Sequence, residues 1–297
     1  MPSKIHPSKR RSWLKNCLYW FCIILLGILL AIVSRVFFFA TFVIPTPSME
    51  PAIIPGDKII VYKMIPGPRI IRNFFSLHKG EKPDITRLKG TRAVRRNDVL
   101  IFNFPYSDWN RLEIDMNVFY AKRCIAIPGD TFFIENGIYK VKNKAMELGN
   151  ITRQMELSKK ADSEFSAELF NCFPQHTENY RWTMKNFGPL YVPKEKDTIS
   201  IDTLNYVLYK KLIEYETGQT VTFDNGVVYL DSQVLNRYTF RQNYYFMAGD
   251  YIFDSKDSRY WGLLPEDHIV GKVAFVLQSK NKKTGKRRWE RFFKTIH

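Results

Sequence analysis

The sequence predicts a mainly β protein with a single N-terminal transmembrane helix, followed by an antiparallel β domain into which a smaller β or α+β domain is inserted. Three observations predict this class. An uncharged run of 19 residues extends from Asn16 to Ser34. Short runs of β-branched and aromatic residues follow, and Pro-Gly or Asn-Gly turns separate them. A more polar stretch, residues 145–220, interrupts these runs.

The uncharged run is long enough to cross a membrane as a helix. At helical rise it spans about 28 Å, close to the thickness of the hydrocarbon layer. A cleavable signal peptide is the main alternative. However, the apolar part of a signal peptide is usually about 7–15 residues long, and no small-x-small cleavage site follows this run. We therefore expect an uncleaved anchor over residues 16–35.

Basic residues gather at the two ends of the chain, whose formal net charge is +16. Residues 1–15 hold five basic residues and no acid, and residues 280–294 hold Lys280, Lys282, Lys283, Lys286, Arg287, Arg288, Arg291 and Lys294 against Glu290. Such patches favour an anionic partner. Because the anchor favours lipid over nucleic acid, we expect membrane phospholipid, and no nucleic acid, as a partner. The positive-inside rule predicts that residues 1–15 form a cytoplasmic tail and that the chain after Arg35 lies outside.

The β part of the chain is predicted in three sections. Residues 36–135 form the first part of the main domain, with strands near 36–45, 57–64, 98–105 and 118–130. Residues 136–242 form the inserted domain, in which 202–215 has helical spacing. The stretches FIENGIYKV and FDNGVVYLD each predict a hairpin with an Asn-Gly turn. Residues 243–297 complete the main domain and end in a basic hairpin, in which apolar runs flank a Thr-Gly turn.

No histidine pattern indicates a metal site, and we expect neither a metal nor a cofactor. His6, His78, His176, His268 and His297 show no paired-ligand spacing. A Ser-His-Asp arrangement would have to recruit His78, His176 or His268.

Serine and lysine offer an alternative. A serine hydroxyl needs a base to become a nucleophile. Lysine can be that base when burial depresses its pKa from about 10.4, because desolvation disfavours the ammonium. Lys122 fits, since it lies in the apolar run VFYAKRCIAIPGD, and Ser48 follows the anchor in IPTPSMEPAIIPGD. The plain alternatives are a lysine that reaches solvent and a serine in a turn.

The stretch IPTPSMEPAIIPGD resembles the nucleophile motif of the bacterial type I signal peptidases, which are membrane-bound peptidases with a Ser/Lys dyad. Three further motifs of that family follow in the same order: RRNDVLIFNFP, YAKRCIAIPGD and MAGDYIFDSKDSRYWGLLPEDHIVGKV. The resemblance covers the anchor and residues 36–62, 95–135 and 245–276.

The resemblance implies a role for each matching residue. Ser48 would be the nucleophile and Lys122 the general base, with Thr46 lending its hydroxyl to the oxyanion hole. Ser255 would orient the Lys122 amine, Asp257 and Arg259 would form a supporting ion pair, and Asp250 would cap a turn. For these supporting residues, turn capping or a surface pair is the alternative. The chain departs from the family at Asn97, at Pro47 and at YIFD (251–254).

The resemblance also implies the substrate. Extended signal peptides of exported preproteins would bind against strand edges, with small side chains at the first and third positions before the cut. The apolar residues at the positions that would line the two substrate pockets are Phe42, Ile44, Ile53, Ile59, Ile101, Tyr120 and Ala121. Alternatively, these residues are ordinary members of the β-sheet core. The implied function is an endopeptidase, anchored once in the bacterial cytoplasmic (inner) membrane, that cleaves signal peptides on the periplasmic or extracytoplasmic side. A catalytically inactive membrane-tethered scaffold or binding paralogue of the same fold is the competing hypothesis.

Overall fold

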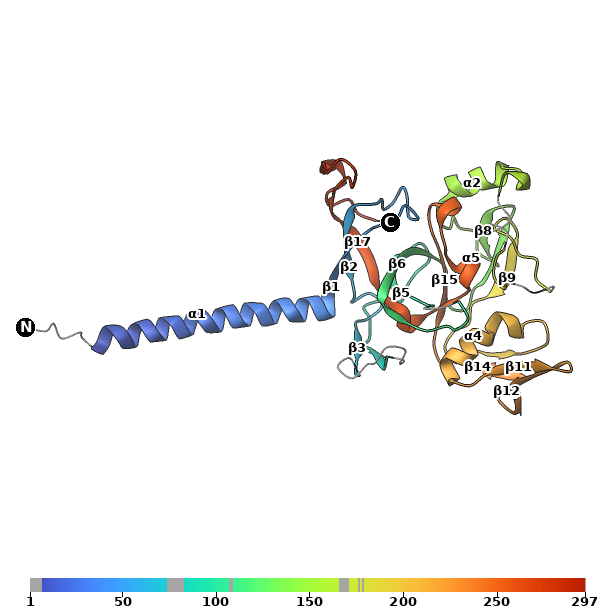
Figure 1. Cartoon of the computed structure of the whole chain (residues 1–297), viewed down its shortest axis with the longest axis horizontal. Helices are drawn as coiled ribbons and strands as arrows, with labels where there is room; N and C mark the ends of the chain where they lie inside the picture. Colours follow the sequence, from blue (N-terminus) through green and yellow to red (C-terminus); the bar gives the residue numbers. More distant parts are fainter. Residues whose placement is uncertain are drawn as a thin grey trace, which may run out of the picture.

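The computed structural model describes residues 7–73, 83–106, 109–165, 171–175, 177 and 179–296. His6, His78, His176 and His297, and the first six residues of the expected cytoplasmic tail, lie outside these ranges. The first element is a long helix, α1 (Pro7–Val33), which extends away from the rest of the protein (Figure 1). Within Trp13–Phe38, a window of 18 residues has a mean hydropathy of 2.7, and none of that window is buried by the rest of the chain. The predicted apolar helix is thus confirmed, and its length and composition fit a membrane anchor.

The end of the helix is fastened to the β part of the chain. A π-helical turn, η1 (Ser34–Phe38), leads directly into β1 (Phe39–Val43). The Lys63 Nζ donates hydrogen bonds to the backbone carbonyls of Arg35, at 2.8 Å, and Val36, at 3.1 Å. Carbonyls in the last turn of a helix have no partner within the helix, so the lysine satisfies two of them. This contact holds the end of the anchor against the strand that precedes Lys63.

One antiparallel sheet of seven strands forms the centre of the protein (Figure 1). Its strand order is β1-β2-β17-β5-β6-β15-β16. The strands after β1 are β2 (Asp57–Tyr62), β5 (Val99–Phe104), β6 (Asp115–Ala126), β15 (Tyr244–Ala248), β16 (Leu264–Pro265) and β17 (Ile269–Ser279). The end of the chain thus pairs with its beginning, and the prediction of a mainly β, antiparallel fold is confirmed.

The sheet is strongly curled. Three strands separate β1 from β6 in the strand order, yet the rings of Phe42 on β1 and Phe119 on β6 have centroids only 5.0 Å apart. β1 lies at the edge of the sheet, and β15 pairs only with residues 123–126 of β6. Among the residues that the structure describes, the first half of β6 therefore has a strand on one side only. Two open strand edges consequently approach each other near Phe42 and Phe119.

Smaller sheets and helices follow in the middle of the chain. The sheets are β3 (Arg69–Ile71) with β4 (Ile85–Arg87); β7 (Thr131–Glu135) with β8 (Ile138–Val141) and β9 (Phe187–Tyr191); β10 (Thr198–Ser200) with β14 (Arg237–Thr239); and β11 (Val221–Asp224) with β12 (Val227–Leu230) and β13 (Gln233–Val234). The helices are α2 (Ile151–Lys159), α4 (Tyr206–Thr217) and α5 (Ser258–Trp261). In the described ranges there are also four 3-10 turns: η2 (Asp162–Glu164), η3 (Ile252–Asp254), η4 (Glu266–His268) and η5 (Trp289–Arg291).

The two Asn-Gly hairpins form as expected, between β7 and β8 and between β11 and β12. Asn136 and Asn225 both take positive φ angles, of 46° and 48°, which a tight hairpin turn of this kind requires. β7 pairs with β8 and β9 and not with the main sheet. The turn at residues 128–129 therefore separates the two sheets, seven residues before the expected boundary at 136.

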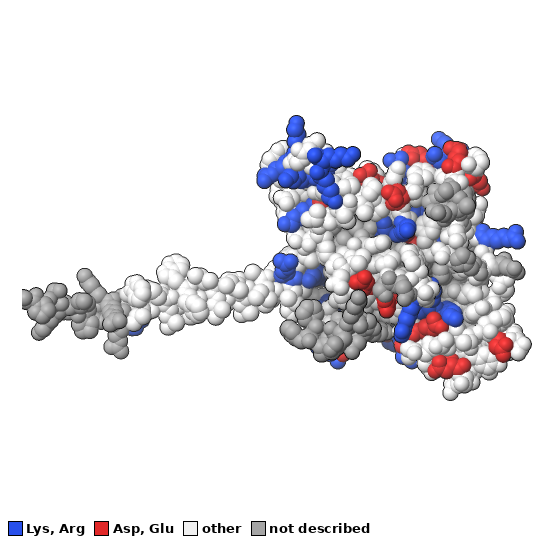
Figure 2. Space-filling view, in the orientation of Figure 1, with Lys and Arg blue, Asp and Glu red and all other residues white. Residues whose placement is uncertain are grey.

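The basic C-terminal segment turns back after β17, but its returning arm is not a regular strand. A bridge joins Lys280 to Arg287, and the chain then forms η5 before the Phe293 N–H donates to the Val276 carbonyl. The reason is Arg291, which is buried because its guanidinium pairs with Asp57 at 2.6 Å. Other lysines and arginines of the segment gather on the surface, as Figure 2 shows at the end of the sheet nearest the anchor.

Candidate active site

Ser48 lies in a tight turn that follows β1. The Glu50 N–H donates to the Pro47 carbonyl, and the Ile53 N–H donates to the Met49 carbonyl. Met49 is almost fully buried and fixes the turn against the sheet, whereas Ser48 keeps 9% of its surface exposed. The turn therefore holds the Ser48 hydroxyl at the surface of a firmly packed core.

A second segment presses against this turn from the end of β15. The Tyr251 N–H donates to the Ser48 carbonyl at 3.1 Å. A Cβ on Gly249 would lie 2.5 Å from the Ser48 carbonyl oxygen and 2.2 Å from the Ser255 hydroxyl. Only glycine leaves space for this approach, so Gly249 lets residues 249–257 pack beside the serine.

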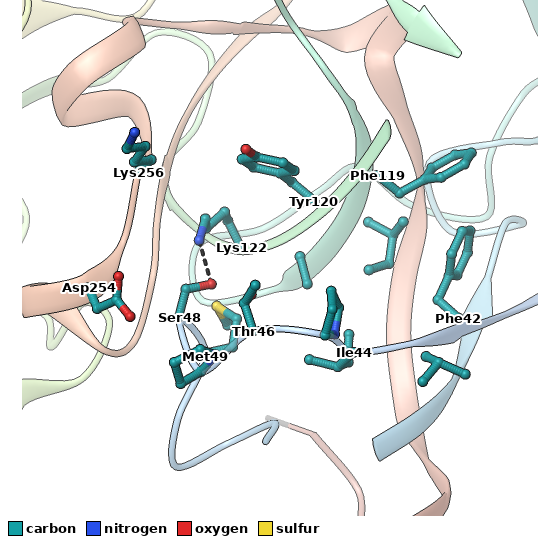
Figure 3. Close-up of a pocket in the computed structure, with 15 residues that line it drawn as sticks. Phe42, Ile44, Thr46, Ser48, Met49, Phe119, Tyr120, Lys122, Asp254 and Lys256 are labelled. Atoms are coloured by element: carbon teal, nitrogen blue, oxygen red, sulfur yellow. Dashed lines mark hydrogen bonds between the residues drawn. The ribbon is translucent and has the colours of Figure 1, made fainter. Parts of the chain in front are cut away.

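Lys122 lies in β6, opposite Leu100 of β5. Its side chain is 3% exposed, and its Nζ donates a hydrogen bond of 2.6 Å to the Ser48 Oγ (Figure 3). Burial lowers the pKa of Lys122 to about 8, because the charged amine loses its hydration. Asp257, Asp254 and Asp250 oppose this shift and Arg259 adds to it. The amine is thus poised to lose its proton near neutral pH while it contacts a hydroxyl.

Asp257 and Arg259 form an ion pair behind the lysine, and both side chains are completely buried. The Arg259 guanidinium donates to both carboxylate oxygens of Asp257 at 2.8 Å. Burial opposes ionisation of Asp257, but Arg259, Lys122 and the Gly249 N–H together hold the pKa of that carboxyl below its usual value. The structure therefore brings these two residues together near the dyad, as the resemblance implies.

The hydrogen bond of Ser255 differs from the expectation. Its hydroxyl donates to Asp257 at 2.7 Å, and the structure shows no hydrogen bond between it and Lys122 within the described residues.

The hydrogen bonds of Asp250 also differ from the expectation. Asp250 does not cap a turn with its side chain but accepts two hydrogen bonds of 2.7 Å from the Arg123 guanidinium. Because Arg123 follows Lys122 directly on β6, this pair fixes the strand on the side away from the serine.

The dyad opens into a cleft of about 470 Å³ between β1 and β6 (Figure 3). Ligand-binding clefts are commonly of this size. Of the residues predicted to contact a substrate, five line it together with Thr46: Phe42, Ile44, Ile101, Tyr120 and Ala121. Ile53 and Ile59 do not. Both are completely buried in the apolar core, where Met49 and Val61 are their neighbours, so the alternative of plain core holds for them.

The cleft also contains residues that the sequence did not single out. They are Val43, Pro45, Pro47, Met49, Phe119, Asp254 and Lys256. Phe119 could have been predicted from the sequence, since it lies two positions from Ala121 and strand residues two apart share a face. Asp254 could not, because it falls in residues 251–254, where the chain departs from the family motif. Lys256 could not either, because the resemblance assigns no role to the position between Ser255 and Asp257. Within the described ranges, no three His, Cys, Asp or Glu side chains converge as a metal site requires.

Comparison with known proteins identifies the family. The family model "Signal peptidase, peptidase S26" matches residues 17–278. The chain is 28% identical over 289 residues to signal peptidase I of Buchnera aphidicola subsp. Acyrthosiphon pisum, covering 94% of this chain and 80% of the relative. It is 26% identical to signal peptidase I of Helicobacter pylori strain J99, over 94% and 93% of the two chains, and 25% identical to that of Aquifex aeolicus, over 86% and 81%. The chain therefore belongs to the signal peptidase family, peptidase S26, whose members are serine peptidases.

Proposed function

We propose that this chain cleaves signal peptides from exported preproteins, with Ser48 as the nucleophile and Lys122 as the general base. Membership of the family supports the reaction. The hydrogen bond of 2.6 Å between the Lys122 amine and the Ser48 hydroxyl carries the assignment of the two residues. A lysine serves as a base only in its neutral form, and the burial of Lys122 favours that form.

The proposed reaction is an acyl transfer in two halves. Ser48 Oγ attacks the carbonyl carbon of the scissile bond while the neutral Lys122 amine takes the hydroxyl proton. The resulting ammonium returns that proton to the leaving amine, which departs as the new N-terminus of the mature chain. Lys122 then takes a proton from water, and the hydroxide attacks the acyl-enzyme ester. When the ester bond breaks, the proton passes to Ser48 and the signal peptide leaves with a carboxylate.

An oxyanion forms in both halves of this reaction and needs hydrogen-bond donors. The Ser48 N–H is one proposed donor and the Thr46 hydroxyl is the other. Thr46 lies in the cleft two residues before Ser48 (Figure 3). Its side chain is exposed, so its hydroxyl is available to a substrate carbonyl.

The substrate is proposed to bind as an extended strand between β1 and β6. Both strands present an open edge to the cleft, which suits the addition of a strand by backbone hydrogen bonds. Phe42, Ile44, Ile101 and Ala121 form its apolar lining. Signal peptides carry small residues at the first and third positions before the cut, and such residues fit a lining of this kind.

The active site is proposed to lie at the outer surface of the bacterial cytoplasmic membrane. The basic residues that precede the uncharged run of 16–34 favour a cytoplasmic N-terminus, which places the sheet outside. Phe38 and Phe39 are exposed where α1 meets β1, and aromatic rings prefer the membrane–water interface. Contact with phospholipid at this level would bring Ser48 close to signal peptides that leave the bilayer.

The test is cleavage of a preprotein by the full chain in detergent. Wild type, Ser48→Ala and Lys122→Ala are compared, with Lys140→Gln as a control on a surface strand. We expect cleavage by wild type and the control and none by the other two. Equal cleavage by all four proteins would refute the dyad, and a folded wild type that cleaves nothing would favour the inactive scaffold.

A further inference from the structure

The cleft ends in two charged side chains on the side away from Phe42 and Phe119. Asp254 and Lys256 both line the cleft and are both exposed. Figure 3 shows them across from the Phe42 end, with Ser48 and Lys122 between the two ends. Neither side chain makes a hydrogen bond or an ion pair with another residue in the described part of the chain. Their charges are therefore available to a molecule that occupies the cleft.

Asp254 is held in place by its neighbours. It ends η3 and follows Phe253, whose ring stacks on Phe165 with centroids 6.2 Å apart and planes 10° apart. The Lys160 amine lies 5.5 Å from the centre of the Phe253 ring. Because aromatic and cationic contacts of this kind restrain a loop, Asp254 has a defined position at the edge of the cleft.

The opposite side of η3 is restrained in the same way. The Arg153 guanidinium of α2 lies 5.0 Å from the centre of the Tyr251 ring. The Tyr251 N–H also holds the Ser48 carbonyl. The aromatic residues that replace the polar stretch of the family thus attach the Asp254 loop both to α2 and to the turn of the nucleophile.

The order of residues along the cleft gives the direction of the substrate. The cut occurs at Ser48, and the small apolar residues that precede the cut fit the lining between Phe42 and Ala121. A peptide that continues past Ser48 must then pass the other end of the cleft. That end holds Asp254 and Lys256, so these residues lie where the mature chain begins.

We propose that Asp254 and Lys256 determine substrate specificity through electrostatic interactions with the first two residues after the cut. This inference rests on the proposed function. Asp254 favours a basic residue directly after the cut and disfavours an acidic one, because its carboxylate lines the cleft on the side of Ser48 away from Phe42 (Figure 3). Lys256 favours an acidic residue and disfavours a basic one at the second position. Exposed pairs of this kind are worth ~1.5- to 5-fold each, and exchange of an attractive pair for a repulsive one roughly doubles that effect in energy.

The test uses one preprotein in versions that differ only after the cut. Lys, Gln or Glu is placed at the first position in one set and at the second position in another. The ratio of kcat/KM for the Lys and Glu versions is measured for wild type, Asp254→Asn and Lys256→Gln. Because the ratio compares two substrates on one enzyme, a changed Lys122 pKa cancels. Asp224→Asn, an exposed carboxylate on β11, is the matched control.

We expect wild type to prefer Lys over Glu at the first position by roughly 2- to 25-fold at low salt. Asp254→Asn should bring that ratio close to one, and Lys256→Gln should abolish the opposite preference at the second position. The control should leave both ratios unchanged. Cleavage of every substrate with ratios that neither variant alters would overturn the inference and leave the proposed function intact. A wild type that cleaves none of them would overturn both.

Discussion

The Ser255 hydroxyl donates its hydrogen bond to Asp257, at 2.7 Å. The same carboxylate oxygen accepts from the Gly249 N–H at 2.9 Å and from Arg259 at 2.8 Å. Asp257 thus joins three parts of the segment that packs against the Ser48 turn. Ser255 contributes to the site by fixing this segment, and the contact of Lys122 with Ser48 depends on it indirectly.

Replacement of Asp257 by Asn should destabilise the protein strongly. The change leaves Arg259 charged and completely buried without its partner, which costs about 3–5 kcal/mol in comparable pairs. The free energy of unfolding in urea, measured in detergent, checks this value. The double variant Asp257→Asn, Arg259→Met should lose less than the sum of the two single variants.

The exposed pair of Glu135 and Lys140 is the matched control. Their side chains are 60% and 46% exposed, so Glu135→Gln should cost no more than about 1 kcal/mol. A loss of stability for Asp257→Asn as small as that of the control would show that the buried pair does not support the site.

Gly249→Ala should lower kcat while the protein remains folded. Its Cβ would lie 2.5 Å from the Ser48 carbonyl, so the serine or the Gly249 segment must move. Displacement of a reacting group by about 1 Å can cost on the order of 10²-fold in rate. Gly129→Ala is the control for loss of glycine, because a Cβ there would meet no atom within 4 Å, although alanine is strained at the φ of Gly129, which is 89°, and not at Gly249. Equal kcat values for the two variants would contradict this prediction.

Lys122→Met should raise the stability of the protein at neutral pH even though it abolishes cleavage. The folded-state pKa of Lys122, about 8, lies below its ordinary value of 10.5. The cost of burying the amine is therefore fully present below pH 8 and disappears as the pH rises toward 10.5. A shift of this size corresponds to roughly 3 kcal/mol.

The thermal midpoint of the two proteins, measured at pH 7 and at pH 10, tests this linkage. Lys122→Met should melt higher than wild type at pH 7, and the difference should shrink at pH 10. If the variant melts at a lower temperature than wild type at both pH values, burial of the Lys122 amine does not destabilise the folded protein.

Thr46→Val should reduce kcat by about 10²- to 10³-fold, the usual cost of one oxyanion donor. Valine matches threonine in shape but has no hydroxyl. Thr46→Ser should retain most of the activity because it keeps the donor. If Thr46→Val cleaves as fast as Thr46→Ser, the hydroxyl of Thr46 does not stabilise the oxyanion.

Local sequence patterns predict most of the fold. The length and lack of charge of residues 16–34 are enough for α1, and the Asn-Gly pairs at 136 and 225 require the positive φ of a hairpin turn. The irregular C-terminal arm was not predictable, because it depends on burial of Arg291 against Asp57, more than two hundred residues away. Periodicity carries no information on such a distant partner.

In the candidate active site, too, some features can be predicted from the local sequence and others depend on the tertiary fold. The apolar run around Lys122 predicts its burial, and burial is what lowers its pKa. By contrast, Ile53 and Ile59 have the same residue type as Ile44 and Ile101, and only the curl of the sheet decides which of them face the cleft. The partners of Ser255 and Asp250 are also tertiary, since Arg123 and Asp250 meet only because β6 pairs with β15.

The pH dependence of kcat/KM tests the central claim most directly, since it reports the protonation of the free enzyme's base. In the proposed mechanism the neutral form of Lys122 is the active one, so kcat/KM should fall tenfold for each pH unit below about 8 and reach a plateau above it. Asp254→Asn removes a negative charge that raises this pKa and should move the profile to lower pH. A profile that is flat from pH 5 to 9 would contradict a lysine base.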